Sequence, residues 1–150
     1  MKTKVLMVCL GNICRSPLAE GILKSKVDSN TVFVDSSGTA GYHVGNPPDK
    51  RSVAVAKKHG IDISTQKCRQ FSKNDFEKFD LIYAMDESNF INILSLANTK
   101  KDEKKVRLLL DELDLGFNEV PDPYYGGVDG FEEVYQMINS ACEAIVKKLN

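Results

Sequence analysis

The sequence predicts an α/β protein with three layers: a parallel β-sheet and helices on both of its faces. Short apolar runs alternate with amphipathic stretches of helical period along the 150 residues, a pattern typical of βαβ units. The stretches between the runs are long enough for right-handed crossovers. No internal repeat, low-complexity stretch or linker interrupts the pattern, so we expect a single domain over residues 1–150.

The chain opens with a buried strand and a helix. Val5–Val8 is a short, continuously apolar run, typical of a strand covered on both faces. Pro17 suits the first position of a helix, with Ser16 as its N-terminal cap. Apolar residues then recur at helical spacing up to Val27. We therefore expect the loop that begins at Cys9 to join the carboxyl end of a strand to a helix N-terminus.

A second strand and a second helix follow. Val32–Val34 predicts a strand, and the Ser-Ser-Gly sequence of residues 36–38 predicts a turn after it. The Asn-Pro-Pro sequence of residues 46–48 predicts the start of the next helix, because proline is favoured in a first helical turn. Gly60 predicts the end of that helix, since glycine is the preferred residue just beyond a helix C-terminus.

The second half of the chain continues this alternation. Leu81–Ala84 and Val106–Leu109 predict two further strands. The Asp86 carboxylate is placed to cap a helix that begins at Glu87. The mixed charges of residues 100–105 predict a solvated loop. The last helix has one apolar face, made of Phe131, Val134, Tyr135, Ile138, Cys142, Ile145 and Leu149.

Composition narrows the possible functions. Apolar residues make up 42% of the chain and charged residues 27%, which is ordinary for a globular protein. The net charge of −1 favours neither nucleic acid nor an anionic membrane as a partner. The apolar run Val5–Leu10 is too short for a signal peptide or a membrane span. The 4 cysteines show neither paired zinc-type spacing nor disulfide-rich density. We therefore expect a cytoplasmic protein with reduced thiols, no metal and no cofactor.

The most informative segment is CLGNICRSP, residues 9–17. A loop between a strand and a helix N-terminus offers several backbone N–H groups to one anion, and Gly11 allows a tight turn there. The Arg15 guanidinium adds a fork of donors that matches phosphate oxygens. The same donors favour the thiolate of Cys9, which would then lie beneath the phosphorus atom as a nucleophile.

Two polar residues of this segment are candidate supports. The Asn12 amide can bond to backbone groups of the loop, and the Ser16 hydroxyl can donate to the thiolate and help it leave. A cysteine that follows a strand is more often a small buried apolar residue. The combination with glycine, asparagine, arginine and serine at this spacing favours a phosphate-binding nucleophile instead.

DPYYGG, residues 122–127, is a second candidate motif, between the last strand and the last helix. This connection can return to the sheet edge that holds Cys9. A departing alkoxide or phenoxide needs a proton, and Asp122 can supply it as a general acid and then act as a general base towards water. The following proline restricts the aspartate to extended conformations. Tyr124 and Tyr125 can wall a flat aromatic substrate, although alone this sequence would also suit a surface turn.

These motifs make the chain similar to the low-molecular-weight protein tyrosine phosphatases. VCLGNICRSP at residues 8–17 and DPYY at residues 122–125 resemble the two signatures of that family. Shorter matches extend the resemblance over nearly the whole chain: DSSGT at 35–39, PDKRS at 48–52, HGI at 59–61 and MDESN at 85–89. The resemblance implies a four-stranded parallel sheet of flavodoxin-like strand order 2-1-3-4 and metal-free hydrolysis through a phosphocysteine.

The resemblance also implies roles for individual residues. Cys9 would be the nucleophile, Arg15 the phosphate clamp, and Asp122 the general acid and then base. The other residues implied to bind the phosphate or line its rim are Leu10, Gly11, Asn12, Ile13, Cys14 and Ser16.

Outside these motifs, the resemblance implies two further site residues. It also shows one position, residue 66, at which this chain departs from the family. Ser37 would steady the loop through its asparagine, and Tyr42 would flank the pocket. Gln66 stands where some members of the family place a histidine, so no histidine support of the loop is expected from that position. We expect His43 and His59 to be surface or packing residues.

Three other functions share parts of this pattern. A thioredoxin-coupled arsenate reductase would need further cysteines near the third strand, where residues 83–86 read YAMD. A protein arginine phosphatase of this fold tends to carry threonine where Ile13 stands. A non-enzymatic phosphate-binding reader would lack the nucleophile or the acid, whereas Cys9 and Asp122 are both present. The apolar Ile13 and the tyrosine pair favour phosphotyrosine.

The expected partners follow from this chemistry. Phosphotyrosine-containing proteins would be the substrates, and oxyanions such as vanadate would be inhibitors. Phosphotyrosine is long enough to reach a deep thiolate, whereas phosphoserine would bring the peptide backbone against Tyr42 or Tyr125. Cys14 is a candidate partner for a reversible disulfide with oxidised Cys9. We expect a monomer that binds neither nucleic acid nor membrane.

Overall fold

The computed structural model describes residues 2–123 and 128–149, in which strands alternate with helices. The strands are β1 (Thr3–Cys9), β2 (Val32–Gly38), β3 (Leu81–Ala84) and β4 (Val106–Leu108). The helices are α1 (Arg15–Lys26), α2 (Lys50–Lys58), α3 (Asp75–Lys78), α4 (Glu87–Leu94), α5 (Lys100–Lys105), the 3-10 helix η1 (Leu109–Glu112) and α6 (Val128–Leu149). The predicted α/β class is confirmed.

Within the described residues the strands form one parallel sheet in the order β2-β1-β3-β4. This confirms the expected flavodoxin-like order. The chain leaves β1 towards β2 on one side and later returns to β3 on the other side. Open α/β sheets bind ligands at the carboxyl ends of strands where the order reverses in this way. The loop after β1 occupies that position.

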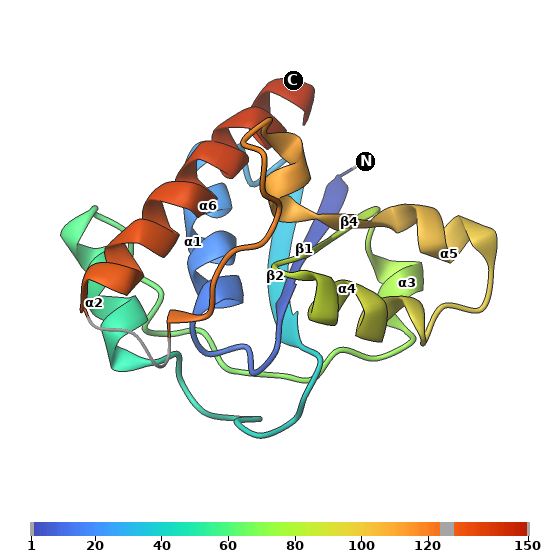
Figure 1. The fold of residues 1–150 in the computed structure, drawn as a ribbon, viewed down its shortest axis with the longest axis horizontal. Helices are drawn as coiled ribbons and strands as arrows, with labels where there is room; N and C mark the ends of the chain where they lie inside the picture. Colours follow the sequence, from blue (N-terminus) through green and yellow to red (C-terminus); the bar gives the residue numbers. More distant parts are fainter. Residues whose placement is uncertain (1, 124–127, 150) are drawn as a thin grey trace.

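Each face of the sheet carries its own apolar cluster. Helices α1, α2 and α6 cover one face, and α3 and α4 pack on the other (Figure 1). Because side chains alternate along a strand, β1 serves both clusters: Val5, Met7 and Cys9 belong to the first, and Leu6 and Val8 to the second. The Cys9 side chain therefore lies on the α1 side. None of the described helices is both long enough and apolar enough to cross a membrane.

Several elements differ from the sequence-based expectation. Strand β2 continues through residues 36–38, predicted as a turn, because they pair in register with residues 7–9 of β1. Residues 100–105 form the exposed helix α5 rather than a loop, and the Thr99 side chain caps it. Leu109 leaves the strand and begins η1. Helix α3, of 4 residues, was not predicted, since so short a helix has almost no periodic signal.

The helix ends confirm some expected caps and correct others. The Asp86 carboxylate caps α4 as predicted, and Gly60 follows α2 in the left-handed region with φ 81°. Helix α2 begins later than predicted, because the Asp49 side chain caps it. Helix α1 begins at Arg15, one residue before Ser16, which was predicted to be its cap. Ser16 therefore lies inside the helix, where its hydroxyl is available to the site.

Candidate active site

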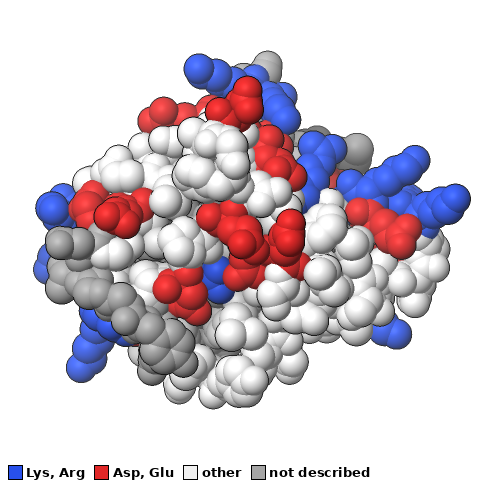
Figure 2. Space-filling view, viewed as in Figure 1, with Lys and Arg blue, Asp and Glu red and all other residues white. Residues whose placement is uncertain are grey.

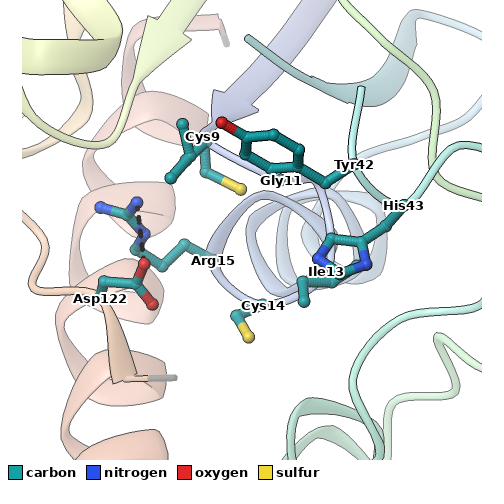
Figure 3. A pocket seen from close by; sticks show the side chains of 9 residues that line it. Cys9, Gly11, Ile13, Cys14, Arg15, Tyr42, His43 and Asp122 are labelled. Carbon is teal, nitrogen blue, oxygen red and sulfur yellow. Dashed lines mark ion pairs between the residues drawn. The ribbon is translucent and has the colours of Figure 1, made fainter. Parts of the chain in front are cut away.

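Segments distant in the sequence meet in a cavity of about 210 Å³ at the carboxyl end of β1. Figure 3 shows its lining side chains converging on a shared space. They are Cys9, Leu10, Gly11, Ile13, Cys14, Arg15, Tyr42, His43 and Asp122. Most of the residues predicted for the site are thus brought together.

The Cys9 side chain is buried, with 3% of its surface exposed, and its sulfur points into the cavity (Figure 3). The Cys9 Sγ lies 3.0 Å from Ser16 Oγ. The N-terminus of α1 begins at Arg15, so backbone N–H groups and the positive end of the helix dipole lie close to the loop. This environment favours negative charge on the sulfur and on a bound anion.

The Arg15 guanidinium is buried and rigidly held. Its Nη1 donates to Asp86 Oδ2 at 2.7 Å and to the Val120 carbonyl at 3.0 Å. Burial opposes its charge, but the proximity of Cys9 and the bond to Asp86 raise the pKa of Arg15 above its ordinary value. The guanidinium is therefore a fixed cation beside the sulfur. Sequence reasoning predicted Asp86 only as a helix cap and missed this second contact.

The Asp122 side chain borders the same cavity and lies next to the arginine. Its Oδ2 is 3.7 Å from Arg15 Nη2, the ion pair drawn in Figure 3. The segment that carries it is tied to the end of β3, because the Val120 N–H donates to the Met85 carbonyl at 2.8 Å. The carboxylate is 37% exposed. It can therefore meet both a bound ester and solvent water.

Asn12 connects the loop to the rest of the protein. It has φ 57°, a left-handed conformation that asparagine tolerates better than most residues. Its Nδ2 donates to Ser16 Oγ at 2.8 Å and to Ser36 Oγ at 3.0 Å. Its Oδ1 accepts from the Arg69 backbone N–H at 3.0 Å. All of these groups hold the loop in place from behind the cavity.

The expectation that Ser37 steadies the loop through Asn12 is wrong by one residue. Side chains alternate along β2, so Ser36 shares the α1 face with Val34. The Ser37 hydroxyl is buried and has no hydrogen-bond partner among the residues that the structure describes. Ser37 contributes its carbonyl instead, which accepts from Ser16 Oγ at 3.3 Å.

The other two cysteines near the loop are buried thiols. Burial raises the pKa of Cys14 to about 12, and the nearby negative charge of Asp49 is the next largest cause of this rise. Burial also raises the pKa of Cys68 to about 11. The Cys68 thiol donates to the Asn12 carbonyl at 2.7 Å, a support that the sequence did not reveal. Gln66 Nε2 donates to the Pro17 carbonyl at 3.1 Å, so this residue contacts α1 rather than the loop.

The outer wall of the cavity is partly as expected. Tyr42 lies at the rim with 76% of its surface exposed. His43, expected to be a surface or packing residue, also lines the cavity, and a Cβ at Gly11 would lie 3.1 Å from its ring. The only signal for this was its place beside the tyrosine. Tyr124 and Tyr125 lie outside the described residues.

The prediction that His59 is a surface or packing residue is confirmed. Its ring stacks on Tyr135 with the ring centroids 3.9 Å apart, and its Nε2 lies 3.0 Å from Glu132 Oε1. This contact joins the end of α2 to α6, and neither His59 nor Glu132 lines the cavity. Over residues 2–123 and 128–149, no group of three or more histidine, cysteine and acidic side chains is placed to hold a metal ion.

Fold and site together define a class: an α/β protein with a cavity built around a cysteine and an arginine at the point where the strand order of a parallel sheet reverses. The family model described as low molecular weight phosphotyrosine protein phosphatase matches residues 4–150. The chain is also 43% identical to the human low molecular weight phosphotyrosine protein phosphatase, over 96% of this chain and 94% of the human protein. The chain belongs to the low molecular weight protein tyrosine phosphatase family.

Solved structures agree with this assignment. A protein tyrosine phosphatase from Entamoeba histolytica, crystallised with Hepes in the active site, has a TM-score of 0.93 and 37% identity, covering 99% of this chain and 97% of that one. Wzb from Vibrio vulnificus, in complex with benzylphosphonate, has a TM-score of 0.87 and 29% identity, covering 99% of each chain. The fold is that of this family.

Proposed function

We propose that this protein hydrolyses phosphotyrosine and other aryl phosphate monoesters through a phosphocysteine intermediate. The observation that carries this proposal is the meeting of Cys9, Arg15 and Asp122 in one cavity. A nucleophile, a cation and a proton donor are the groups that phosphoryl transfer to cysteine requires. The human relative, 43% identical, carries the same activity in its name.

In the first step the Cys9 thiolate attacks phosphorus. The S–P bond forms as the bond from phosphorus to the ester oxygen breaks, and Asp122 gives its proton to the departing oxygen. Charge spreads over the three remaining phosphoryl oxygens. The loop N–H groups and the Arg15 guanidinium would bind those oxygens, and Asp86 and the Val120 carbonyl already hold the guanidinium before the substrate arrives.

In the second step water replaces the cysteine. Asp122, now a carboxylate, takes a proton from the water, whose oxygen attacks phosphorus while the S–P bond breaks. The Cys9 thiolate leaves with the Ser16 hydroxyl 3.0 Å from its sulfur, and inorganic phosphate is released. A hydrogen bond to the thiolate stabilises it as a leaving group and as the resting nucleophile.

We propose that the substrates are phosphotyrosine proteins. Apolar and aromatic side chains of Leu10, Ile13 and Tyr42 line the cavity, and the buried sulfur suits a long, rigid phosphoester. Wzb of Vibrio vulnificus, a structural relative, binds benzylphosphonate, which also joins a ring to a phosphorus group.

Paired peptides of one sequence test this preference. We expect kcat/KM for a phosphotyrosine peptide to exceed that for the phosphoserine peptide by at least about a hundredfold, a difference that misplacing the phosphorus atom produces. Comparable values would contradict a ring-selective site.

We propose that Cys14 protects the nucleophile from overoxidation. Peroxide would convert the Cys9 thiolate to a sulfenic acid, and Cys14 would then attack that sulfur, form a disulfide and release water. Both residues line the same cavity and both are free cysteines. Dithiothreitol should restore more activity after peroxide in the wild type than in Cys14→Ser, and equal recovery would contradict the protective role.

We also propose that residues 1–150 act as a single domain, as a monomer in the cytoplasm, where a reducing environment preserves thiols. The free cysteines support this. Size-exclusion chromatography with light scattering tests the monomer, and a stable dimer at micromolar concentration would contradict it.

A further inference from the structure

A buried carboxylate lies behind the loop, outside the set of residues that line the cavity. The Glu20 side chain, on the second turn of α1, is only 5% exposed. Its Oε1 accepts from Ser36 Oγ at 2.6 Å, and its Oε2 lies 2.6 Å from Lys24 Nζ. Burial of a carboxylate costs free energy unless it is paired and hydrogen-bonded, and its partner Lys24 is itself 53% exposed. The buried carboxylate therefore needs an explanation beyond the stability of the helix.

The carboxylate fixes the direction of one hydroxyl. An ionised carboxylate can only accept hydrogen bonds, so Ser36 must donate its single hydroxyl hydrogen to Glu20. The Ser36 oxygen is then an acceptor on its other side. It accepts from Asn12 Nδ2 at 3.0 Å.

The Asn12 amide lies between Ser36 and the site. Its Oδ1 accepts from the Arg69 N–H, which can only donate, and so the amide nitrogen faces the two serines. That nitrogen has two hydrogens: one goes to Ser36 Oγ and the other to Ser16 Oγ. The Ser16 oxygen is therefore an acceptor towards Asn12, and its own hydrogen must be donated elsewhere.

The Ser16 hydrogen has two acceptors within reach. Cys9 Sγ lies at 3.0 Å and the Ser37 carbonyl at 3.3 Å. A charged acceptor forms the stronger hydrogen bond, so the bond to the thiolate prevails when Cys9 is ionised. The hydrogen bonds therefore diverge from the Asn12 amide nitrogen: on one side Ser36 passes its hydrogen to Glu20, and on the other side Ser16 passes its hydrogen to Cys9.

We propose that Glu20 is a positioning residue for the reaction, because it keeps the Ser36 oxygen as the acceptor that holds the Asn12 amide beside Ser16, whose hydroxyl is left to donate to the Cys9 thiolate. The inference rests on the proposed function. Without an acceptor at residue 20, the Ser36 hydroxyl can turn its hydrogen towards the Asn12 amide, where two donors would face each other. Asn12 then loses its fixed position, and the bond from Ser16 to the sulfur is weakened.

Two substitutions of similar length separate the role of the acceptor from that of the charge. Glu20→Met removes both, whereas Glu20→Gln removes the charge and keeps an oxygen that can accept from Ser36. The pH midpoint of Cys9 alkylation by iodoacetamide, followed by mass spectrometry, is the readout. We expect Glu20→Met to raise this midpoint by about one pH unit and to lower kcat about tenfold with little change in KM, the effect of losing one hydrogen bond to a charged group. Glu20→Gln should stay within about threefold of the wild type.

A matched control and a second variant keep this test decisive. Glu112→Met removes another buried carboxylate, 4% exposed and paired with Lys148 at 2.8 Å, and should leave the Cys9 midpoint unchanged. Ser36→Ala breaks the connection while keeping Glu20. It should raise the midpoint as Glu20→Met does, and the double variant should show no further rise.

The outcomes that would overturn the proposal are distinct. An equal upward shift in Glu20→Met and Glu20→Gln would mean that the acceptor oxygen at residue 20 does not matter, and a downward shift in both would mean that only a negative charge had been removed. No shift in Glu20→Met or in Ser36→Ala would mean that Glu20 does not act on the thiolate. Absence of ester hydrolysis by the wild type would contradict the proposed function alone, because the alkylation readout does not depend on turnover.

Discussion

At the scale of single residues, the site separates two cysteines that share one loop. Cys9 Sγ has the Ser16 hydroxyl and the start of α1 beside it. Cys14 lies among buried groups near Asp49, and its raised pKa of about 12 means that it keeps its proton at neutral pH. The thiolate is the reactive form of cysteine. The two residues should therefore differ in reactivity although they lie on the same cavity.

Alkylation measures this difference directly. Treated briefly with iodoacetamide at pH 7, the native protein should carry label on Cys9, because the raised pKa values of Cys14, Cys68 and Cys142, about 12, 11 and 12, keep those residues as neutral thiols. Peptide mapping by mass spectrometry locates the label, and inorganic phosphate should slow its appearance. Labelling of Cys14 as fast as Cys9 would contradict the assignment of the nucleophile.

The acid role of Asp122 gives a second prediction for a single residue. Asp122→Asn should lower kcat for an aryl phosphate by about a hundredfold or more, since general acid catalysis contributes at least that much. Hydrolysis by the wild type should fall as the pH rises, because Asp122 loses the proton it must donate. That alkaline fall should flatten in the variant. An unchanged pH profile would assign the acid to another group.

Single residues also show where sequence reasoning was limited. Cys9, Arg15 and Asp122 could be predicted because each belongs to a short motif. Asp86 and Ser36 contact the loop from positions distant in the sequence, and no local pattern connects them to it. Ser37 was predicted to support Asn12 where the structure has Ser36, because two consecutive serines do not show which one faces α1.

At the scale of elements, the end of β2 supports the loop that follows β1. The two strands stay in register up to the pair Cys9 and Gly38, and the next N–H, of Thr39, donates to the Cys9 carbonyl at 2.9 Å. The loop backbone lies directly against Gly38: a Cβ there would lie 2.7 Å from the Leu10 carbonyl and 2.9 Å from the Asn12 nitrogen. A glycine is needed for this close approach.

Gly38→Ala should therefore damage the site more than the fold. We expect a loss of stability of about 1–3 kcal/mol from the overpacked contact and a loss of activity of at least about tenfold, because the loop must move. Thermal unfolding and kcat/KM measure the two effects. Gly130→Ala, in α6 where the nearest heavy atom is 4.0 Å away, is the control. Wild-type activity in Gly38→Ala would show that this contact does not position the loop.

The alternation of apolar and amphipathic stretches was sufficient to predict the strands and the long helices, because burial on the sheet determines both. It did not predict the continuation of β2 through residues 36–38, where pairing with β1 prevails over a turn-like composition. It also missed α5, whose lysines and acids carry no apolar stripe, although Thr99 caps it. The sequence pattern thus missed a strand end that is fixed by pairing with a distant strand and a short helix that has no apolar stripe.

At the scale of the whole molecule, the positive charge that receives the anion is internal. Figure 2 shows Asp and Glu side chains gathered near the middle of one face, with Lys and Arg mostly towards its edges. Arg15 is only 2% exposed, and the net charge of the chain is −1. We therefore expect recognition of phosphate to depend on loop N–H groups and one buried guanidinium rather than on a basic surface.

The covalent intermediate is the most direct test of the whole account. Asp122→Asn, which slows turnover, should be mixed with p-nitrophenyl phosphate, quenched under denaturing conditions, and mapped by mass spectrometry, with Cys9→Ser as the control. The account predicts a phosphoryl group on the Cys9 peptide and none in Cys9→Ser. A phosphoryl group on any other residue, or continued turnover by Cys9→Ser, would contradict it.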